Sequence, residues 1–391
     1  MIYVGIDVAK EKHDCCITNS DGGILAGPFT ITNTKDGFLS LYGKIRKAGG
    51  KQENVKVGLE ATGHYSYNIL GFLLENNVPT FLINPMHTNL YRKSLSLRQT
   101  KTDKVDSKTI ARMLMSGVDF QSYTAALYHN EELKSLTRYR FAKVRERAKL
   151  KTSIARLVVI LFPELEALVP TLHLNTVYQL LEEYPGASLV AEVHLTRLAN
   201  LIRTASKGCY DKDKALEIRN AARNSIGSVM PAKSLELQHT IRLIRELDAE
   251  ISAVEKRIEA IMDKINSPIL TIPGINYRMG AMILAEIGDF NRFKGPDNIL
   301  AYAGMSPTTY QSGNFESTHS RMEKRGSKYL RYALFNAAKY VCHWDPTFQE
   351  YLAKKRAEGK HYNVAVSHAA KKLVRVIWAL EKSGQPYRKD R

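Results

Sequence analysis

The sequence is poor in cysteine and contains no long apolar run. Its four cysteines are Cys15, Cys16, Cys209 and Cys342, and no pair has the Cys-x-x-Cys spacing of a zinc or redox site. No apolar run reaches the roughly 18 residues of a membrane span, and the first residues are typical of a strand rather than a signal peptide. These absences argue against a disulfide framework and a transmembrane protein. We therefore expect a reducing, cytoplasmic setting.

Acidic residues are also scarce relative to basic ones. The chain has 57 Lys and Arg against 39 Asp and Glu, a formal net charge of +18. Such an excess favours a polyanionic partner, nucleic acid before a membrane surface. A basic protein without such a partner is the plainer alternative. The length of 391 residues predicts two or three domains, and the hydrophobic content of 44% is typical of a soluble globular protein.

The N-terminal part has the periodicity of an α/β domain. Strands are predicted over residues 2–6, 16–18, 24–32, 55–59 and 79–83. Helices are predicted over residues 36–47 and 67–75. The first three strands suggest an antiparallel meander, and the later strands are joined by helices. This order predicts a mixed sheet covered by helices.

Four carboxylates stand where this sheet should expose its edge. Asp7 ends the first strand, and Glu60 ends the fourth. Asp103 and Asp106 lie three residues apart at the start of a predicted helix, so they share one face. Ile110 continues that stripe, which turns Asp106 towards the sheet. Oxygen ligands suit hard divalent cations, so the four residues are candidates for binding one or two Mg²⁺ ions.

Each carboxylate also has a plainer interpretation. Asp103 is a possible helix N-cap with Asp106 as its capping partner. Asp7 is a possible turn former, and Glu60 a possible solvated strand end. The metal-site interpretation is favoured because an acid recurs at each of three exposed places of one sheet.

The middle of the chain is expected to be helical. A long helix predicted over 131–162 is rich in Lys and Arg, which favours contact with a nucleic-acid backbone over a merely solvated face. Residues 163–227 are mostly helical, and no chemistry is predicted there. From Leu237 to Ile265 the apolar residues follow a heptad pattern. It predicts a coiled coil, either against the preceding helix or, as we prefer, between two protomers.

Two features mark the C-terminal part. Residues 270–288 resemble a helix-hairpin-helix, although Asn276 replaces the second Gly of that motif, and a plain αα turn is the alternative. Further on, Ser312 precedes Gly313 in a polar run without apolar periodicity, which predicts a loop followed by basic residues. A serine hydroxyl beside cations suits attack on a phosphodiester, since the cations stabilise the developing charge. An ordinary Ser-Gly turn is the alternative.

Basic side chains accompany each of these regions. The residues expected to contact nucleic acid are Arg98, Lys101, Lys104, Arg138, Arg140, Lys143, Arg145, Arg147, Arg321, Lys324, Arg325 and Lys328.

Several short motifs occur together in a fixed order. They are Gly-Ile-Asp-Val-Ala-Lys at 5–10, Leu-Glu-Ala-Thr-Gly at 59–63, Ile-Asn-Pro at 83–85, Lys-Thr-Asp-Lys-Val-Asp at 101–106, and the stretch from 300 to 330 with its Gln-Ser-Gly. In these motifs the chain resembles the DEDD transposases of IS110-type bacterial insertion sequences, which are related to the Piv-type DNA invertase. The resemblance implies a RuvC/RNase H-like N-terminal fold and a Mg²⁺-binding tetrad of Asp7, Glu60, Asp103 and Asp106. It also implies that Ser312 is the nucleophile.

The resemblance carries further expectations. The implied function is a DNA recombinase that moves its own insertion sequence through a phosphoserine intermediate, guided by a bridge RNA. A homo-oligomer, either dimer or tetramer, and association with the bacterial nucleoid are expected. The expected fold class is α/β plus all-α. The expected domains are a RuvC-like domain (1–125), a helical linker and coiled coil (126–266, with an insertion at 163–227) and a C-terminal transposase domain (267–391).

Three other functions remain open. In a metal-dependent junction nuclease, the tetrad would activate water and Ser312 would be only structural. A non-enzymatic RNA- or DNA-binding scaffold would use the carboxylates only as caps and surface charges. A site-specific invertase would use the same chemistry on a different DNA.

Overall fold

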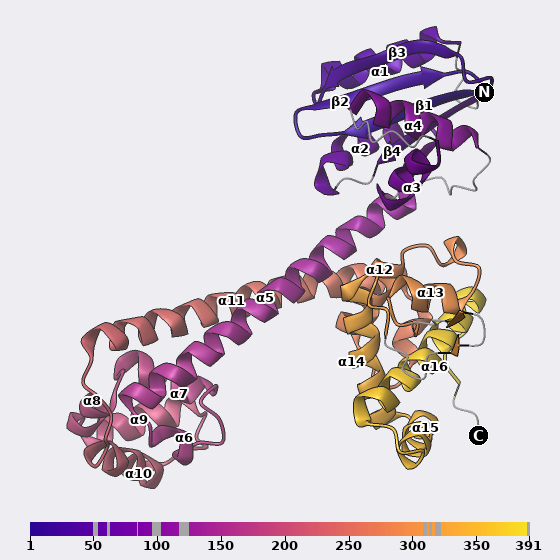
Figure 1. The fold of residues 1–391 in the computed structure, drawn as a ribbon. Helices are drawn as coiled ribbons and strands as arrows, with labels where there is room; N and C mark the ends of the chain where they lie inside the picture. The colour runs from indigo at the N-terminus through magenta and orange to yellow at the C-terminus, as the bar shows by residue number, and fades with distance from the viewer. Residues whose placement is uncertain are drawn as a thin grey trace. The chain divides into compact units, whose positions relative to one another are not determined.

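The computed structural model describes residues 1–49, 54–60, 63–83, 85–95, 103–116, 125–307, 311–312, 315–316 and 322–388. They form two compact units. The α/β unit comprises Met1–Glu132 with Gly288–Lys294, and the helical unit comprises Leu133–Ile287 with Gly295–Arg391. Figure 1 shows the elements of both units along the chain. The finer division at 125 and 266 stays a prediction. No described helix is long and apolar enough to cross a membrane.

The α/β unit is built on one five-stranded sheet. Its strands are β1 (Ile2–Val8), β2 (Lys12–Thr18), β3 (Ile24–Thr32), β4 (Val55–Glu60) and β5 (Thr80–Ile83), in the spatial order β3-β2-β1-β4-β5. β2 pairs antiparallel with both β1 and β3, whereas β4 pairs parallel with both β1 and β5. This confirms the predicted mixed sheet with an initial meander. β2 begins earlier than expected, at Lys12.

One face of the sheet is covered by α1 (Lys35–Lys47) and α2 (Tyr67–Glu75). Thr34 caps α1 by accepting a hydrogen bond from the Gly37 N–H. Alternate apolar side chains of β1, β2 and β4 pack here against Phe38 of α1 and Leu70 of α2. Because side chains alternate along a strand, the remaining residues of these strands must point to the opposite face.

That opposite face is covered by α4 (Asp103–Met115), which follows α3 (Pro85–Leu95) (Figure 1). The close approach depends on two glycines. A Cβ added at Gly5 of β1 would lie 2.0 Å from the Ser107 carbonyl oxygen and 2.5 Å from the Ala111 nitrogen. A Cβ at Gly58 of β4 would lie 2.8 Å from Ile110. The first turns of α4 therefore rest almost directly on the strand backbone.

The helical unit contains two long helices that run antiparallel. These are α5 (Ala125–Leu161), which belongs to this unit from Leu133 on, and α11 (Pro231–Ile265). Ion pairs link the later part of α5 to the start of α11 through Arg156 and Glu236, and the earlier part to its end through Arg140 and Glu255. The heptad positions of α11 are buried over most of their length, from Leu237 to Ile258. A dimeric coiled coil stays a prediction.

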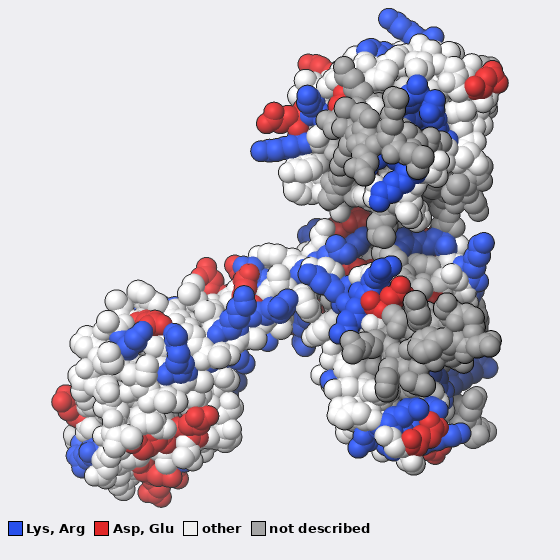
Figure 2. Space-filling view, viewed as in Figure 1, with Lys and Arg blue, Asp and Glu red and all other residues white. Residues whose placement is uncertain are grey.

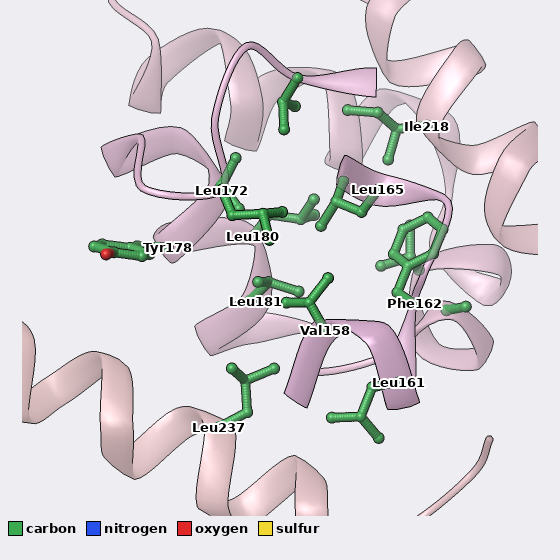
Figure 3. Packing of buried hydrophobic residues seen from close by; sticks show 14 of the residues in the cluster. Val158, Leu161, Phe162, Leu165, Leu172, Tyr178, Leu180, Leu181, Ile218 and Leu237 are labelled. Carbon is green, nitrogen blue, oxygen red and sulfur yellow. The ribbon is translucent and has the colours of Figure 1, made fainter. Parts of the chain in front are cut away.

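The segment predicted to be a helical insertion has its own hydrophobic core. Its helices are α6 (Leu165–Leu168), α7 (Asn175–Glu183), α8 (Ala187–Glu192), α9 (Leu195–Ala205) and α10 (Lys212–Arg223). They pack with the end of α5 and the start of α11 around Phe162, which is fully buried (Figure 3). This segment is therefore a small folded subdomain that packs against one end of the α5–α11 helix pair.

The C-terminal part is also mostly helical. Its elements are η3 (Pro268–Thr271), α12 (Tyr277–Ile287), η4 (Phe290–Arg292), α13 (Pro296–Tyr302), β6 (Gln311–Ser312), β7 (Phe315–Glu316), α14 (Lys328–Trp344), α15 (Pro346–Ala357) and α16 (Tyr362–Ser383). A single 3₁₀ turn, η3, stands where the first helix of a helix-hairpin-helix was expected. A Cβ on Gly274, in the following turn, would lie 2.7 Å from the backbone of Tyr340. The turn therefore packs on α14, which fits the plain-turn alternative.

The α4 packing can be tested with one added methyl group. Gly5→Ala should lower the free energy of unfolding of the full chain by roughly 1–3 kcal/mol, because the methyl group meets backbone atoms that cannot rotate away. Gly27→Ala, in the edge strand β3, is the matched control because nothing lies within 4 Å of its added Cβ. Equal denaturant midpoints for the two variants would show that α4 does not pack this closely.

Candidate active site

Two of the predicted carboxylates lie side by side at one edge of the sheet. The parallel pairing of β1 and β4 runs up to Ile6 opposite Leu59, and the next residues are Asp7 and Glu60. Both are half-buried. By strand alternation they share the face of Gly5 and Gly58, which is the face covered by α4.

The third carboxylate comes from α4. Asp106 is 5% exposed and precedes Ser107, whose carbonyl oxygen lies over Gly5. This confirms that Asp106 is turned towards the sheet. A cleft of about 310 Å³ is lined by Glu60, Pro85, Thr88, Asn89, Arg92 and Asp106. Asp103 is the first residue of the same helix, but its side chain lies outside the described part.

An arginine of α3 balances the charge of Asp106. Arg92 Nη1 lies 3.0 Å from Asp106 Oδ1, and Arg92 Nη2 donates to Asn89 Oδ1 at 2.9 Å. Asp106 is nearly inaccessible, with a side chain 7% exposed. The sequence favoured phosphate contact for Arg92, as part of the basic run beside the carboxylates, and did not reveal its pairing with Asp106. The available signal was its spacing, since Thr88, Asn89 and Arg92 fall on one helical face just after β5.

Two further oxygen groups lie on this side of the sheet. Asp14 of β2 stands directly opposite Asp7, is buried, and accepts a hydrogen bond from Thr30 Oγ1 at 2.6 Å. Residues opposite each other in an antiparallel pair point to the same face, so Asp14 adds a carboxylate that the sequence reading missed. Thr88 is 3% exposed, and its hydroxyl has no hydrogen-bond partner among the residues that the structure describes.

The atom types of these side chains fit a hard divalent cation. Carboxylate and hydroxyl oxygens are the ligands that Mg²⁺ takes. Among the described side chains, which do not include that of Asp103, no group of three or more His, Cys, Asp or Glu is arranged to hold a metal ion. The Arg92 guanidinium occupies the position beside Asp106 Oδ1, at 3.0 Å.

Ser312 lies in a short hairpin rather than in the loop expected from its polar neighbours. β6 and β7 pair antiparallel, with Ser312 opposite Phe315. Pro307 and Met322 form a bridge at the base. Local periodicity could not show this, because each strand has only two residues. The Ser312 side chain lies outside the described part.

The base of this hairpin is tightly held by backbone contacts. The N–H groups of Lys324 and Ser327 donate to the carbonyls of Gly304 and Tyr302, at 3.0 and 2.9 Å. A Cβ on Gly326 would lie 2.1 Å from the Tyr302 carbonyl oxygen, and Gly326 has a φ of +115° that favours glycine. Arg331 Nη1 donates to the Ala303 carbonyl at 2.8 Å. The described residues that flank the hairpin, up to Pro307 and from Met322 on, are therefore held in place.

The basic residues near the hairpin and the tetrad differ in what the structure shows. Lys324, Arg325 and Lys328 are exposed. Arg98, Lys101 and Arg321 lie outside the described residues, as does the side chain of Lys104.

Five arginines and lysines of α5 were predicted to contact nucleic acid, and four of them form ion pairs within the helical unit. Arg140 pairs with Glu255 at 2.7 Å, Lys143 with Glu250 at 2.8 Å, and Arg147 with Asp248. Figure 2 shows acidic side chains among the basic ones along the long helices. These acids of α11 lie about a hundred residues further along the chain, so the local sequence could not reveal the pairing. Their contact with nucleic acid stays a prediction.

Arg138 pairs with the most buried of these acids, Glu286. Arg138 Nε and Nη2 donate to the two carboxylate oxygens of Glu286, at 2.6 and 3.0 Å, and the Glu286 side chain is 0% exposed. Ser327, the N-cap of α14, donates to the same carboxylate at 2.6 Å. Glu286 of α12 therefore joins α5 to the start of α14, directly after the serine hairpin. Arg145 is exposed and has no ion pair within the described part of the chain.

Two family models match the chain, one at each end. Residues 4–163 match the DEDD transposase model of the IS110 type, and residues 266–353 match the transposase model of the IS116/IS110/IS902 family. A carboxylate-edged α/β unit followed by a transposase domain defines an enzyme that acts on DNA. The chain belongs to the IS110 family of transposases.

Several relatives are similar over nearly the whole length. The chain is 26% identical to the insertion element IS900 uncharacterized 42 kDa protein of Mycobacterium paratuberculosis, covering 97% of this chain and 95% of that one. It is 24% identical to the pilin gene-inverting protein of Moraxella bovis, covering 99% and 98%. It is 23% identical to the transposase for insertion sequence element IS1111A of Coxiella burnetii, covering 98% and 91%.

The Arg138–Glu286 pair should be strongly stabilising. Arg138→Met leaves a buried carboxylate without its cation, and we expect a loss of roughly 2–3 kcal/mol in the free energy of unfolding. This is below the cost for a wholly buried pair because the arginine side chain is 41% exposed to screening water. Arg145→Met on the same helix is the control, with an expected change within about 0.5 kcal/mol. Equal denaturant midpoints would contradict the structural role of the pair.

Proposed function

We propose that this chain cuts and rejoins the DNA of an insertion sequence through a phosphoserine intermediate formed by Ser312. The observation that carries the proposal is the serine hairpin, whose base is fixed by the Gly304 and Gly326 contacts beside the exposed Lys324 and Arg325. A nucleophile needs a defined position, and nearby cations stabilise negative charge on the phosphoryl oxygens. The match of residues 266–353 to a transposase model supports this use of the hairpin.

In the proposed step, Ser312 Oγ attacks a backbone phosphorus and loses its proton to a carboxylate or to water. The P–O bond to the 3′ oxygen breaks, and that oxygen leaves as a 3′-hydroxyl after taking up a proton. The product is a phosphoserine ester on the 5′ side. A 3′-hydroxyl from another strand then attacks this ester and releases Ser312. The energy of the original bond is conserved, so strand exchange needs no ATP.

We further propose that Asp7, Glu60, Asp103 and Asp106 bind Mg²⁺ at the edge of a RuvC-like sheet. The family implies a divalent metal. When bound, it would supply Lewis-acid stabilisation of the phosphoryl and leaving-group oxygens. In its absence, Arg92 neutralises Asp106 and keeps that buried carboxylate in place. The reaction requires the serine and the carboxylates at one phosphate, from one protomer or from two.

The proposed partners are donor and target DNA, a bridge RNA, and further copies of the chain. The net charge of +18 supports a nucleic-acid partner of either kind. The RNA rests on the family resemblance alone, as does association with the nucleoid. The buried heptad face of α11 is satisfied within the chain over most of its length, so the dimer or tetramer proposal rests on the family and not on α11.

Two other activities have specific support. A Mg²⁺-dependent junction nuclease needs only the cleft of Glu60 and Asp106, which would activate water without a covalent intermediate. A site-specific invertase would use the proposed serine chemistry, and the similarity to the pilin gene-inverting protein of Moraxella bovis favours it.

A denaturing gel separates the covalent mechanism from the nuclease. Wild type, incubated with Mg²⁺, bridge RNA and labelled donor DNA, should form a protein–DNA adduct that Ser312→Ala abolishes. Asp106→Asn should reduce the adduct at least roughly a hundredfold, as for loss of a major electrostatic group. Ser306→Ala, at the base of the same hairpin, is the matched control and should keep the adduct. DNA cleavage without an adduct, persisting in Ser312→Ala, would contradict the proposal and leave the nuclease.

Removing the internal cation should strengthen metal binding. We expect Arg92→Met to bind Mn²⁺ roughly tenfold more tightly in calorimetry, about 1.4 kcal/mol, because the metal no longer displaces a guanidinium from Asp106. Arg112→Met removes an exposed charge from α4, the helix of Asp106, and serves as the control. Adding Asp106→Asn to Arg92→Met should abolish the gain. Unchanged or weaker Mn²⁺ binding by Arg92→Met would show that Asp106 is not a metal ligand.

A further inference from the structure

One helix of the helical unit displays a row of exposed aromatic rings. On α14, Tyr332 is 41% exposed, Tyr340 52% and Trp344 61%. With Lys328 and Asn336 they fall at four-residue steps, which is one ridge of an α-helix whose successive members are about 6 Å apart along the axis. A single exposed tyrosine is ordinary, as at Tyr362, which is 43% exposed. Three exposed rings on one ridge form a patch, and such a patch points to a binding surface.

The ridge is distinct from the side of α14 that forms the core. Leu330, Leu334, Ala337 and Val341 are fully buried. The backbone of Tyr340 is covered by the turn at Gly274, while the Tyr340 side chain points out. The core beneath α14 therefore does not include the rings of Tyr340 and Trp344.

The charge of α14 is of one sign. The helix contains Lys328, Arg331 and Lys339 and no Asp or Glu in 17 residues. Lys328 Nζ lies 5.0 Å from the ring centroid of Tyr329, and Lys339 Nζ lies 4.8 Å from that of Phe335. Within the described chain neither lysine has an acidic partner. A ridge of rings and unpaired cations complements a ligand that has flat apolar faces and negative charge.

Rings at both ends of the ridge contact neighbouring rings, and Tyr332 is held against another helix. Phe141 of α5 packs edge-on against Tyr332 and Tyr329, with centroids 4.8 and 5.3 Å apart. At the other end, His343 packs edge-on against Trp344 at 4.9 Å. Pre-oriented rings lose little conformational entropy when a ligand stacks on them.

We infer that this ridge binds an unpaired strand of nucleic acid. Its bases stack on Tyr332, Tyr340 and Trp344, and its phosphates contact Lys328 and Lys339. Bases in an intact duplex cannot bind this way because their faces are covered by neighbouring pairs. The inference rests on the proposed function for the class of partner and adds the form of the strand and the face that holds it. Lys328 follows Lys324 and Arg325, so the ridge continues the basic segment behind the serine hairpin.

The fluorescence of Trp344 reports directly on stacking of bases against its indole ring. Trp344 and Trp378 are the two tryptophans of the chain, so full-length Trp378→Phe leaves Trp344 as the only indole. We expect a single-stranded DNA oligonucleotide to quench its fluorescence saturably, and the blunt duplex of the same sequence to quench it at least fivefold less at equal nucleotide concentration. No quenching, or equal quenching by strand and duplex, would overturn the inference.

Matched variants measure the contribution of the rings. Tyr340→Ala and Trp344→Ala should each weaken single-strand binding by the full chain at least about fivefold. Tyr340→Phe keeps the ring and should bind as wild type. Tyr362→Ala removes a 43% exposed ring from α16 and should also leave binding unchanged. Circular dichroism confirms folding of each variant.

Two results would overturn the inference. The first is that Tyr340→Ala and Trp344→Ala bind single strands as tightly as wild type does. The second is that the two variants change only the sedimentation coefficient of the protein, which would make the ridge a contact between copies of the chain. Failure of the proposed serine chemistry would appear instead in the Ser312 trapping gel, whatever the ridge binds.

Discussion

The close approach of α4 to the bare backbone of β1 and β4 is the constraint on which the carboxylate site depends. Any side chain at Gly5 would lift the first turns of α4, because a Cβ there falls 2.0 Å from the Ser107 carbonyl oxygen. Only with α4 in this position does Asp106 reach the cleft that it shares with Glu60, near the ends of β1 and β4. The cleft, the Arg92 contact and the proposed cation site follow from that packing.

The helical unit depends on electrostatic contacts of a different kind. Its long helices α5 and α11 are joined by ion pairs along their length, and Glu286 joins α5 to the start of α14. Most of the basic charge of α5 is therefore balanced inside the unit. The cations left exposed include Lys324, Arg325 and Lys328, which lie at the base of the serine hairpin and the start of α14. These three exposed cations are thus available for phosphates on the C-terminal side of the proposed nucleophile.

Local patterns predicted much of the fold and part of the site. The alternation in β1 and β4 placed Asp7 and Glu60 at strand ends, and the stripe shared with Ile110 correctly turned Asp106 inward. Contacts between distant segments could not be predicted. Arg138 looked like a phosphate ligand because Glu286 lies 148 residues away in sequence. Asp14 was missed for the same reason, since its position opposite Asp7 depends on the register of β1 and β2.

The central proposal is that Asp106, which α4 holds in the cleft with Glu60, binds one cation together with Glu60 and Asp7. Anomalous diffraction from crystals of the full chain soaked in Mn²⁺ tests this most directly. The account predicts a manganese peak within ligand distance, about 2.0–2.3 Å, of oxygens from these three carboxylates, with Arg92 turned away from Asp106. A cleft without manganese, in crystals where Arg92 still pairs with Asp106 at saturating Mn²⁺, would contradict it.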